Sequence, residues 1–276
     1  MTVPPSTWQP AEPAPSDTRR DWLLFALALV AIVAITVWAP GGLLDKADKV
    51  GYAVCHRITL RSFLIGERQM PLCARCTGQY LGAVVGLLYL LGRGRSRASE
   101  FPAPAVLTAL VLFLGIWAFD GVNSYLTLFP GAPHLYEPHN ILRVSTGLLQ
   151  GFAVISLVWP VFNLTAWAQP EPQHSLHHVG ELALLVGVGA LLVLALQSEI
   201  EAILLPLALI SSLGTLIMLT LVLTVMALLV LGRANRATRW RHLFMPLALG
   251  LVSSQVLIAL IDSARASLTR ALGLPF

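Results

Sequence analysis

The chain has 276 residues, of which 56% are hydrophobic and only 12% are charged, against about 25% charged residues in a typical soluble domain. Several apolar stretches reach the roughly 20 residues that a helix needs to cross a bilayer, and they lack the alternation that a β-barrel requires. The net charge of +4 comes from arginines grouped in particular loops, as membrane orientation selects, and no basic patch with interleaved aromatic residues suggests nucleic-acid binding.

The amino-terminal segment 1–21 is rich in proline and poor in apolar residues, so we predict a disordered tail. The apolar run 22–38 follows it directly. The pair Ala39-Pro40 after this run makes a poor cleavage site, so the run is predicted to be a retained membrane anchor and not a signal peptide. The next segment, 41–71, is polar, and we expect it to hold the chemically active residues.

Six further apolar runs are separated by prolines and charged loops. They predict transmembrane helices at residues 73–91, 106–129, 141–163, 182–196, 203–231 and 244–261. The fold class is therefore predicted to be all-α, a polytopic transmembrane helical bundle with about seven spans. We divide it into the tail, a membrane domain at 22–163 that contains the cysteine loop, and a carboxyl-terminal membrane module of three helices at 164–276.

The distribution of arginines gives an orientation. With seven spans, nine arginines fall on the side of the amino terminus, in the tail and in the loops at 92–101 and 232–243. On the opposite side, the basic residues concentrate in the cysteine loop. If these serve a site there, the remaining bias predicts a cytoplasmic amino terminus and an extracytoplasmic cysteine loop.

All three cysteines, Cys55, Cys73 and Cys76, lie within 22 positions of one another, and an odd number of cysteines cannot form only internal disulfides. The C-x-x-C spacing lets two thiolates from one turn bind a single ion, and Cys55 with His56 completes a tetrahedral, zinc-like ligand set. Neighbouring side chains seldom point at the same ion. His56 is alternatively a group that orients a ligand, with water or a carboxylate in the fourth position.

Two alternatives to a metal site remain open. Cys73 and Cys76 can form a redox-active dithiol or a disulfide, and an extracytoplasmic position would favour that interpretation. The three thiols can also be inert buried groups. The spacing of the ligands favours the metal site over both.

Asp120 is an ionisable residue inside an apolar predicted span. A charge at the bilayer centre costs about 2.5 to 3.5 kcal/mol on insertion scales, so such a residue normally faces the bundle and pairs with another group. We predict that Arg143 or the metal is its partner and that Asp120 is the candidate catalytic residue. The plainer alternative is an Asp120–Arg143 ion pair that only joins two helices.

The helix ends that carry the cysteines and Asp120 meet at one membrane face, and polar residues collect there. The candidate contacts for a substrate or a phosphate group are Arg57, Arg61, Arg75, Asn140 and Arg143. Guanidinium groups bind phosphate bidentately, so these residues suit a phosphate-bearing lipid or substrate. The plainer interpretation is that the arginines contact lipid headgroups, as any interfacial arginine does.

Two sequence blocks resemble a family of uncharacterised prokaryotic membrane proteins that is catalogued as a domain of unknown function. The first is Cys55-His56-Arg57 followed by Pro71-Leu72-Cys73-Ala74-Arg75-Cys76-Thr77-Gly78, and the second is Asp120-Gly121 followed by Asn140-Ile141-Leu142-Arg143. The resemblance covers about residues 45–160. It implies a multi-pass protein of the prokaryotic plasma membrane and supports the cysteine site, but it implies no reaction.

The sequence therefore predicts an integral membrane protein that contacts the lipid bilayer and binds zinc or a similar divalent metal at one membrane face. Three functions fit such a site: a metal-assisted enzyme acting on a lipid or lipid-phosphate substrate, a transporter with Asp120 and Arg143 in its path, or a scaffold in which the metal is structural. A cavity open to one membrane face would favour the enzyme, and access from both faces would favour transport. No protein partner is indicated.

Overall fold

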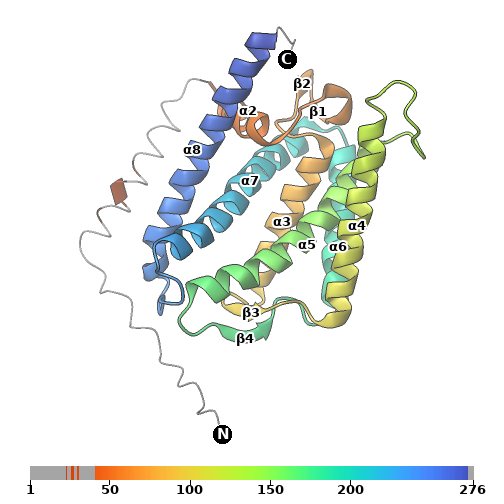
Figure 1. Cartoon of the computed structure of the whole chain (residues 1–276). Helices are drawn as coiled ribbons and strands as arrows, with labels where there is room; N and C mark the ends of the chain where they lie inside the picture. Colours follow the sequence, from red (N-terminus) through yellow and green to blue (C-terminus); the bar gives the residue numbers. More distant parts are fainter. Residues whose placement is uncertain (1–22, 24–25, 28–29, 31–40, 273–276) are drawn as a thin grey trace, which may run out of the picture.

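The computed structural model describes residues 23, 26–27, 30 and 41–272. The predicted tail 1–21 lies outside the described residues, and so does the predicted span 22–38 apart from four positions. The described part is a bundle of helices with two short two-stranded sheets (Figure 1). The prediction of an all-α membrane bundle is confirmed.

Within the described residues, five helices are long and apolar enough to cross a membrane. They are α4 (Pro104–Leu126), α5 (Asn140–Ala166), α6 (Val179–Gln197), α7 (Glu201–Val230) and α8 (Arg241–Leu272). These helices correspond to the last five spans predicted from the sequence. Only α8 differs much from its prediction, because it continues from 261 to Leu272 through charged and polar residues that end the apolar run without ending the helix.

The predicted span 73–91 is α3 (Ala74–Gly92), a helix of 19 residues that is not among the five most apolar ones. Its first turns are polar, which lowers its mean hydropathy. At 1.5 Å per residue it is still about 28 Å long, close to the thickness of a hydrocarbon core. It packs against α5 and α7 inside the bundle.

The polar segment 41–71 contains more regular structure than the sequence predicted. It forms an amphipathic helix, α2 (Leu43–Val54), a single 3-10 turn at Thr59–Arg61 and a hairpin of β1 (Leu64–Ile65) and β2 (Arg68–Gln69). The apolar face of α2 packs against α7 and α8. Four charged residues stand between the apolar residues of α2 along the sequence, so a search for long apolar runs does not detect the helix.

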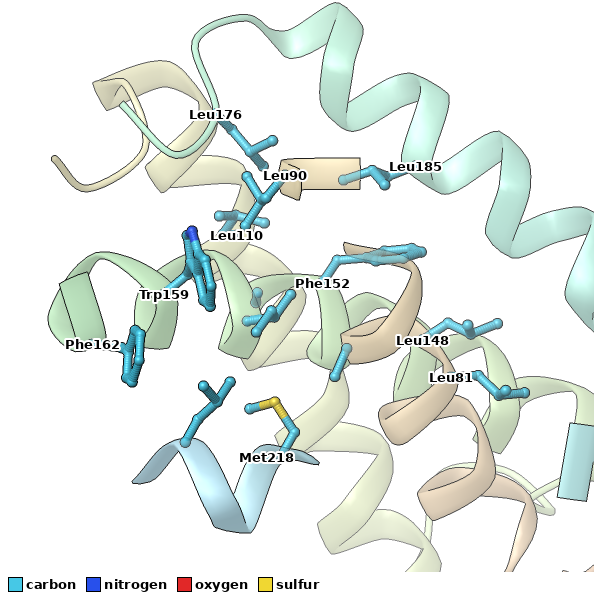
Figure 2. Packing of buried hydrophobic residues seen from close by; sticks show 14 of the residues in the cluster. Leu81, Leu90, Leu110, Leu148, Phe152, Trp159, Phe162, Leu176, Leu185 and Met218 are labelled. Atoms are coloured by element: carbon cyan, nitrogen blue, oxygen red, sulfur yellow. The ribbon is translucent and has the colours of Figure 1, made fainter. Parts of the chain in front are cut away.

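The centre of the bundle is α5. In its most apolar 18-residue window 61% of the residues are buried, against 17% in α4, so α4 lies at the periphery and faces lipid. Phe152, Trp159 and Phe162 of α5 are buried, and leucines from neighbouring helices surround them (Figure 2). The rings of Trp159 and Phe162 stack with their centroids 5.5 Å apart.

Glycines set the distance between α3 and α5. A Cβ atom on Gly147 or Gly151 of α5 would overlap the carbonyl oxygen of Arg75 or Gln79 on α3. Likewise, a Cβ atom on either of two glycines of α3 would overlap a backbone carbonyl oxygen of α5. Small residues of this kind let the backbones of membrane helices approach closely. The two helices that carry Arg75, Cys76, Asn140 and Arg143 are therefore held in direct backbone contact.

The two ends of the bundle differ in chemistry. At one end lie α2, the β1–β2 hairpin and the last turns of α8, while β3 (Ala98–Glu100) and β4 (Glu171–His174) lie at the other (Figure 1). At the β3–β4 end, the guanidinium of Arg95 donates to both carboxylate oxygens of Glu181, at 2.8 and 2.6 Å. This bidentate ion pair ties the loop after α3 to the start of α6.

Candidate metal centre

The three cysteines come together at the end of the bundle that carries α2. Cys55 directly follows α2, Cys73 is the N-cap of α3, and Cys76 lies in the first turn of α3. Their Sγ atoms all lie within 4.8 Å of one another. The C-x-x-C spacing places two of these thiols on one turn, and the β1–β2 hairpin reverses the chain so that Cys55 meets them.

The hairpin is held against α2 by ion pairs. The guanidinium of Arg68 donates to Asp45 and Asp48, both at 2.6 Å, and that of Arg57 donates to Asp48 at 2.8 Å. A second constraint is a close approach of backbones, because a Cβ atom on Gly51 of α2 would overlap the carbonyl of the proline before the C-x-x-C motif. Arg57, which the sequence predicted as a phosphate contact, is therefore paired with a carboxylate of α2.

Backbone amides surround the sulfur of Cys55. The N–H of Cys73 donates to it at 3.3 Å and the N–H of Arg57 at 3.5 Å. Hydrogen bonds with the thiols of Cys73 and Cys76, together with these amides, lower the pKa of Cys55 to about 2, although burial opposes the shift. Donors arranged in this way favour a thiolate at Cys55, whereas the hydrogen bond with Cys55 raises the pKa of the Cys73 thiol. A thiolate is the form of cysteine that binds a metal.

An arginine far along the sequence forms hydrogen bonds with the backbone of the cysteine loop. The guanidinium of Arg265, near the end of α8, donates to the carbonyl oxygens of Tyr52 at 2.6 Å and of Cys55 at 2.7 Å. It also lies 4.2 Å from the centroid of the Tyr52 ring. These contacts satisfy the free carbonyls at the end of α2. Nothing in the sequence pairs Arg265 with the cysteines, so only the tertiary structure identifies it.

His56 is not part of the close group of metal-ligating side chains found among the described residues, which consists of the three cysteines alone. Its side chain is exposed beside them and lines the adjacent cavity. A tetrahedral ion bound by three thiolates accepts one further ligand. His56 as that fourth ligand stays a prediction.

A cavity of about 160 Å³ borders the cysteines, and we call it the arginine cavity. Its walls come from the cysteine loop, the start of α3, the end of α4 and the start of α5. They include Arg61, Cys73, Arg75, Ser124, Tyr125 and Arg143. Three of the predicted phosphate contacts thus line one cavity together with two predicted metal ligands, Cys73 and His56.

Asp120 of α4 is 1% exposed and is paired with Arg75 of α3, not with Arg143. Its other carboxylate oxygen accepts a hydrogen bond from the hydroxyl of Tyr136 at 2.8 Å, and the hydroxyl of Thr146 donates at 3.3 Å. The predicted Asp120–Arg143 pair is therefore wrong. The physical reason is the close contact of α3 with α5, which brings Arg75 into the position beside Asp120.

The loop after α4 is folded so that Tyr136 reaches Asp120. The side chain of Asn123 donates to the carbonyl oxygen of Tyr136 at 2.9 Å and accepts from the N–H of Leu135 at 2.7 Å. Asn123 lies on the same helix face as Asp120, three residues further on. This pair of hydrogen bonds fixes the loop over the end of α4.

Arg143 is 6% exposed and contacts no carboxylate among the residues that the structure describes. It donates to the hydroxyl of Ser124 at 3.2 and 3.3 Å and to the side-chain oxygen of Asn140 at 3.0 Å. Arg61 donates to the hydroxyl of Thr127 at 3.0 Å. Burial and the nearby charge of Arg75 lower the pKa of Arg61, as expected where like charges gather.

The sequence model of the family described as "Predicted membrane protein (DUF2085)" matches residues 55–157, which run from the first cysteine through most of α5. An uncharacterised protein of Methanocaldococcus jannaschii is 30% identical over 146 residues, covering 53% of this chain and 76% of the relative. An uncharacterised protein of Methanothermobacter thermautotrophicus is 34% identical over 104 residues, covering 38% of this chain and 83% of the relative. No solved structure matches.

Proposed function

The chain belongs to the DUF2085 family of predicted membrane proteins, and we propose that it is a metalloenzyme in which Cys55, Cys73 and Cys76 bind one zinc-like ion. The observation that carries the proposal is the gathering of three Sγ atoms within 4.8 Å at one end of a membrane bundle, beside a cavity. Zn–S bonds of about 2.3 Å place sulfur atoms about 3.8 Å apart in a tetrahedron. No pair of Sγ atoms therefore needs to approach by more than about 1 Å.

Thiolates select zinc among the common divalent metals because they are soft ligands. A zinc ion with three protein ligands and an exchangeable fourth position supplies a Lewis acid or an activated water. Cys73 lies in the wall of the arginine cavity, so that fourth position would face the cavity. In this proposal Arg61 and Arg143 bind the substrate. Asp120, the predicted catalytic candidate, positions Arg75, because its carboxylate is already engaged by three donors.

The location of the cavity supports an enzyme over a transporter. The residues that line it belong to one end of the bundle. Arg143 lies in the cavity wall and Asp120 binds Arg75 of the same wall, so both groups belong to a site at that end. In a transporter, the same site would need a path to both faces.

A structural metal in a scaffold is the second candidate. It is favoured by the burial of Cys55, which is 4% exposed, and by the contacts of Arg265 that already fix this loop. A structural ion would join the end of α2 to the start of α3. Removal of the metal separates the two candidates, because a structural ion contributes directly to folding free energy whereas an exchangeable catalytic ion contributes less.

We expect protein purified without chelator to carry about one zinc-like ion per chain. Cys73→Ser and Cys76→Ser should each reduce the metal content to near zero, because an alcohol is a much poorer zinc ligand than a thiolate. Elemental analysis measures this. Thr77→Ser is a matched control, since it lies in the same turn and keeps all three thiols. A stable, metal-free preparation with three freely titrating thiols would contradict the proposal.

We further propose that the protein lies in the plasma membrane of a prokaryotic cell with its amino terminus in the cytoplasm and the cysteine end outside. Glu67 in the β1–β2 turn and Arg93 after α3 are both exposed and lie at opposite ends of α3. A thiol introduced by Glu67→Cys should react with an impermeant maleimide in intact cells, and one introduced by Arg93→Cys only after permeabilisation. The reverse pattern would overturn the orientation.

A further inference from the structure

We infer that the arginine cavity is a receptor for a phosphate group, with Arg61 and Arg143 as the residues that bind it. The inference names a substrate class for the proposed metalloenzyme and rests on that proposal for its catalytic meaning. The binding site itself follows from charge, hydrogen-bonding capacity, size and position, which are independent of the metal.

The charges in the cavity wall do not balance. Of the three arginines, Arg75 is paired with Asp120, while Arg61 and Arg143 contact only neutral oxygen atoms among the described residues. A divalent ion with three thiolates would carry one negative charge, which still leaves one positive charge in excess. Buried charges without a counter-charge are costly, so proteins usually pair them with an ion or a ligand. A bound anion would complete this site.

The unused hydrogen-bond donors favour phosphate among anions. A guanidinium has five N–H donors in a fixed fork. Arg143 directs two of its nitrogens at a single hydroxyl and the third at Asn140, and Arg61 makes one described hydrogen bond. Donors from two separate forks therefore remain available. A phosphate group offers three acceptor oxygens and up to two negative charges, whereas a carboxylate offers two oxygens and one charge.

The size and position of the cavity limit the ligand to a headgroup. Its volume of about 160 Å³ is well below the roughly 300 to 1,000 Å³ of sites that enclose a whole drug-sized ligand. Two lining residues, Tyr125 in the last turn of α4 and Leu128 just after this peripheral helix, are at the same time exposed on the outside of the bundle. A phosphate group attached to a membrane lipid can therefore enter from the side, with its acyl chains left in the bilayer.

Calorimetric titration of the purified full-length protein in detergent tests the site with two probes, inorganic phosphate and a short-chain phosphatidic acid. We expect one equivalent to bind to the natural protein, and Arg61→Gln and Arg143→Gln each to weaken binding about tenfold or more, as loss of a charge-assisted contact predicts. Arg93→Gln is the matched control, because Arg93 is an exposed arginine at the opposite end of α3 and does not line the cavity. Arg143→Lys keeps the charge without the fork and should weaken binding less than Arg143→Gln.

The outcomes are separable. Binding of inorganic phosphate with the expected arginine dependence identifies a free phosphate or soluble ester, and binding of phosphatidic acid alone identifies a lipid headgroup. No binding of either probe, or equal loss in Arg93→Gln, overturns the inference. Metal content measured on the same samples distinguishes this failure from failure of the proposed metalloenzyme, since the arginine variants should keep their metal and the cysteine variants should lose it.

Discussion

Gly147→Leu is expected to force α3 and α5 apart and to destabilise the bundle. A side chain at this position would overlap the backbone carbonyl of Arg75, and neither helix can yield without moving as a whole. Overpacking of this kind typically costs 1 to 3 kcal/mol and occasionally more, and the obstacle here is backbone, so we expect a loss of about 3 kcal/mol in the free energy of unfolding. Thermal unfolding of the purified protein in detergent measures it.

The same substitution should damage the site. Arg75 belongs to the turn that also carries Cys76, so separation of α3 from α5 moves these residues away from Arg143. Metal content and phosphate binding should fall together with stability. Gly187→Leu in α6 is the matched control, because a Cβ atom there would meet nothing within 4 Å, and its effect should be about 0.5 kcal/mol or less. Equal stability of the two variants would show that the contact of α3 with α5 does not exclude a side chain at position 147.

Asp120→Asn and Arg75→Gln should each destabilise the protein more than the two changes combined. The Asp120 side chain is 2% exposed and that of Arg75 is 19% exposed, so removal of one partner leaves a largely buried charge without compensation, at a cost of about 3 to 5 kcal/mol. Arg75 and Tyr136 donate to different oxygens of Asp120, and in asparagine an NH₂ donor replaces one of these oxygens, so one of the two donors loses its acceptor. The double variant has no charge to strand, so its stability should recover.

The comparison needs thermal stability and metal content for each protein. Arg143→Gln serves as the control partner, since Arg143 does not contact Asp120, and it should not rescue Asp120→Asn. If Arg75→Gln restores the stability of Asp120→Asn and Arg143→Gln does not, the double-mutant cycle of Asp120 and Arg75 should give a coupling free energy of about 1 kcal/mol or more. If Asp120 is instead a metal ligand or a catalytic base, Asp120→Asn would lose metal or activity while the fold survives, and no second change would restore it.

The carboxyl-terminal helices contribute directly to the candidate centre. Arg265 lies outside the region 55–157 that the family sequence model matches, yet it holds the carbonyl of Cys55. The helices α6 and α7 also pack against α3 and α5. The division of the chain at residue 163 stays a prediction, and in the structure Arg265 of the carboxyl-terminal part contacts the loop that carries Cys55.

The sequence by itself determined the fold class and the approximate position of the site. Long apolar runs specify membrane helices because an unsatisfied backbone is too costly in lipid, and this local property requires no knowledge of neighbours. The C-x-x-C spacing brings Cys73 and Cys76 onto one turn for the same local reason. An acidic residue inside an apolar run, Asp120, marked the buried polar cluster because lipid excludes a charge that has no partner.

The tertiary structure decided which residues meet. Helical periodicity fixes the face on which Asp120 lies but not the rotation or depth of the helix packed against it, and the glycine contact of α3 with α5 selects Arg75 over Arg143 as its partner. Arg265 reaches Cys55 across more than two hundred residues, which no local pattern encodes. The helix α2 escaped detection because its apolar face is interrupted in sequence and becomes continuous only in three dimensions, where packing against α7 and α8 stabilises it.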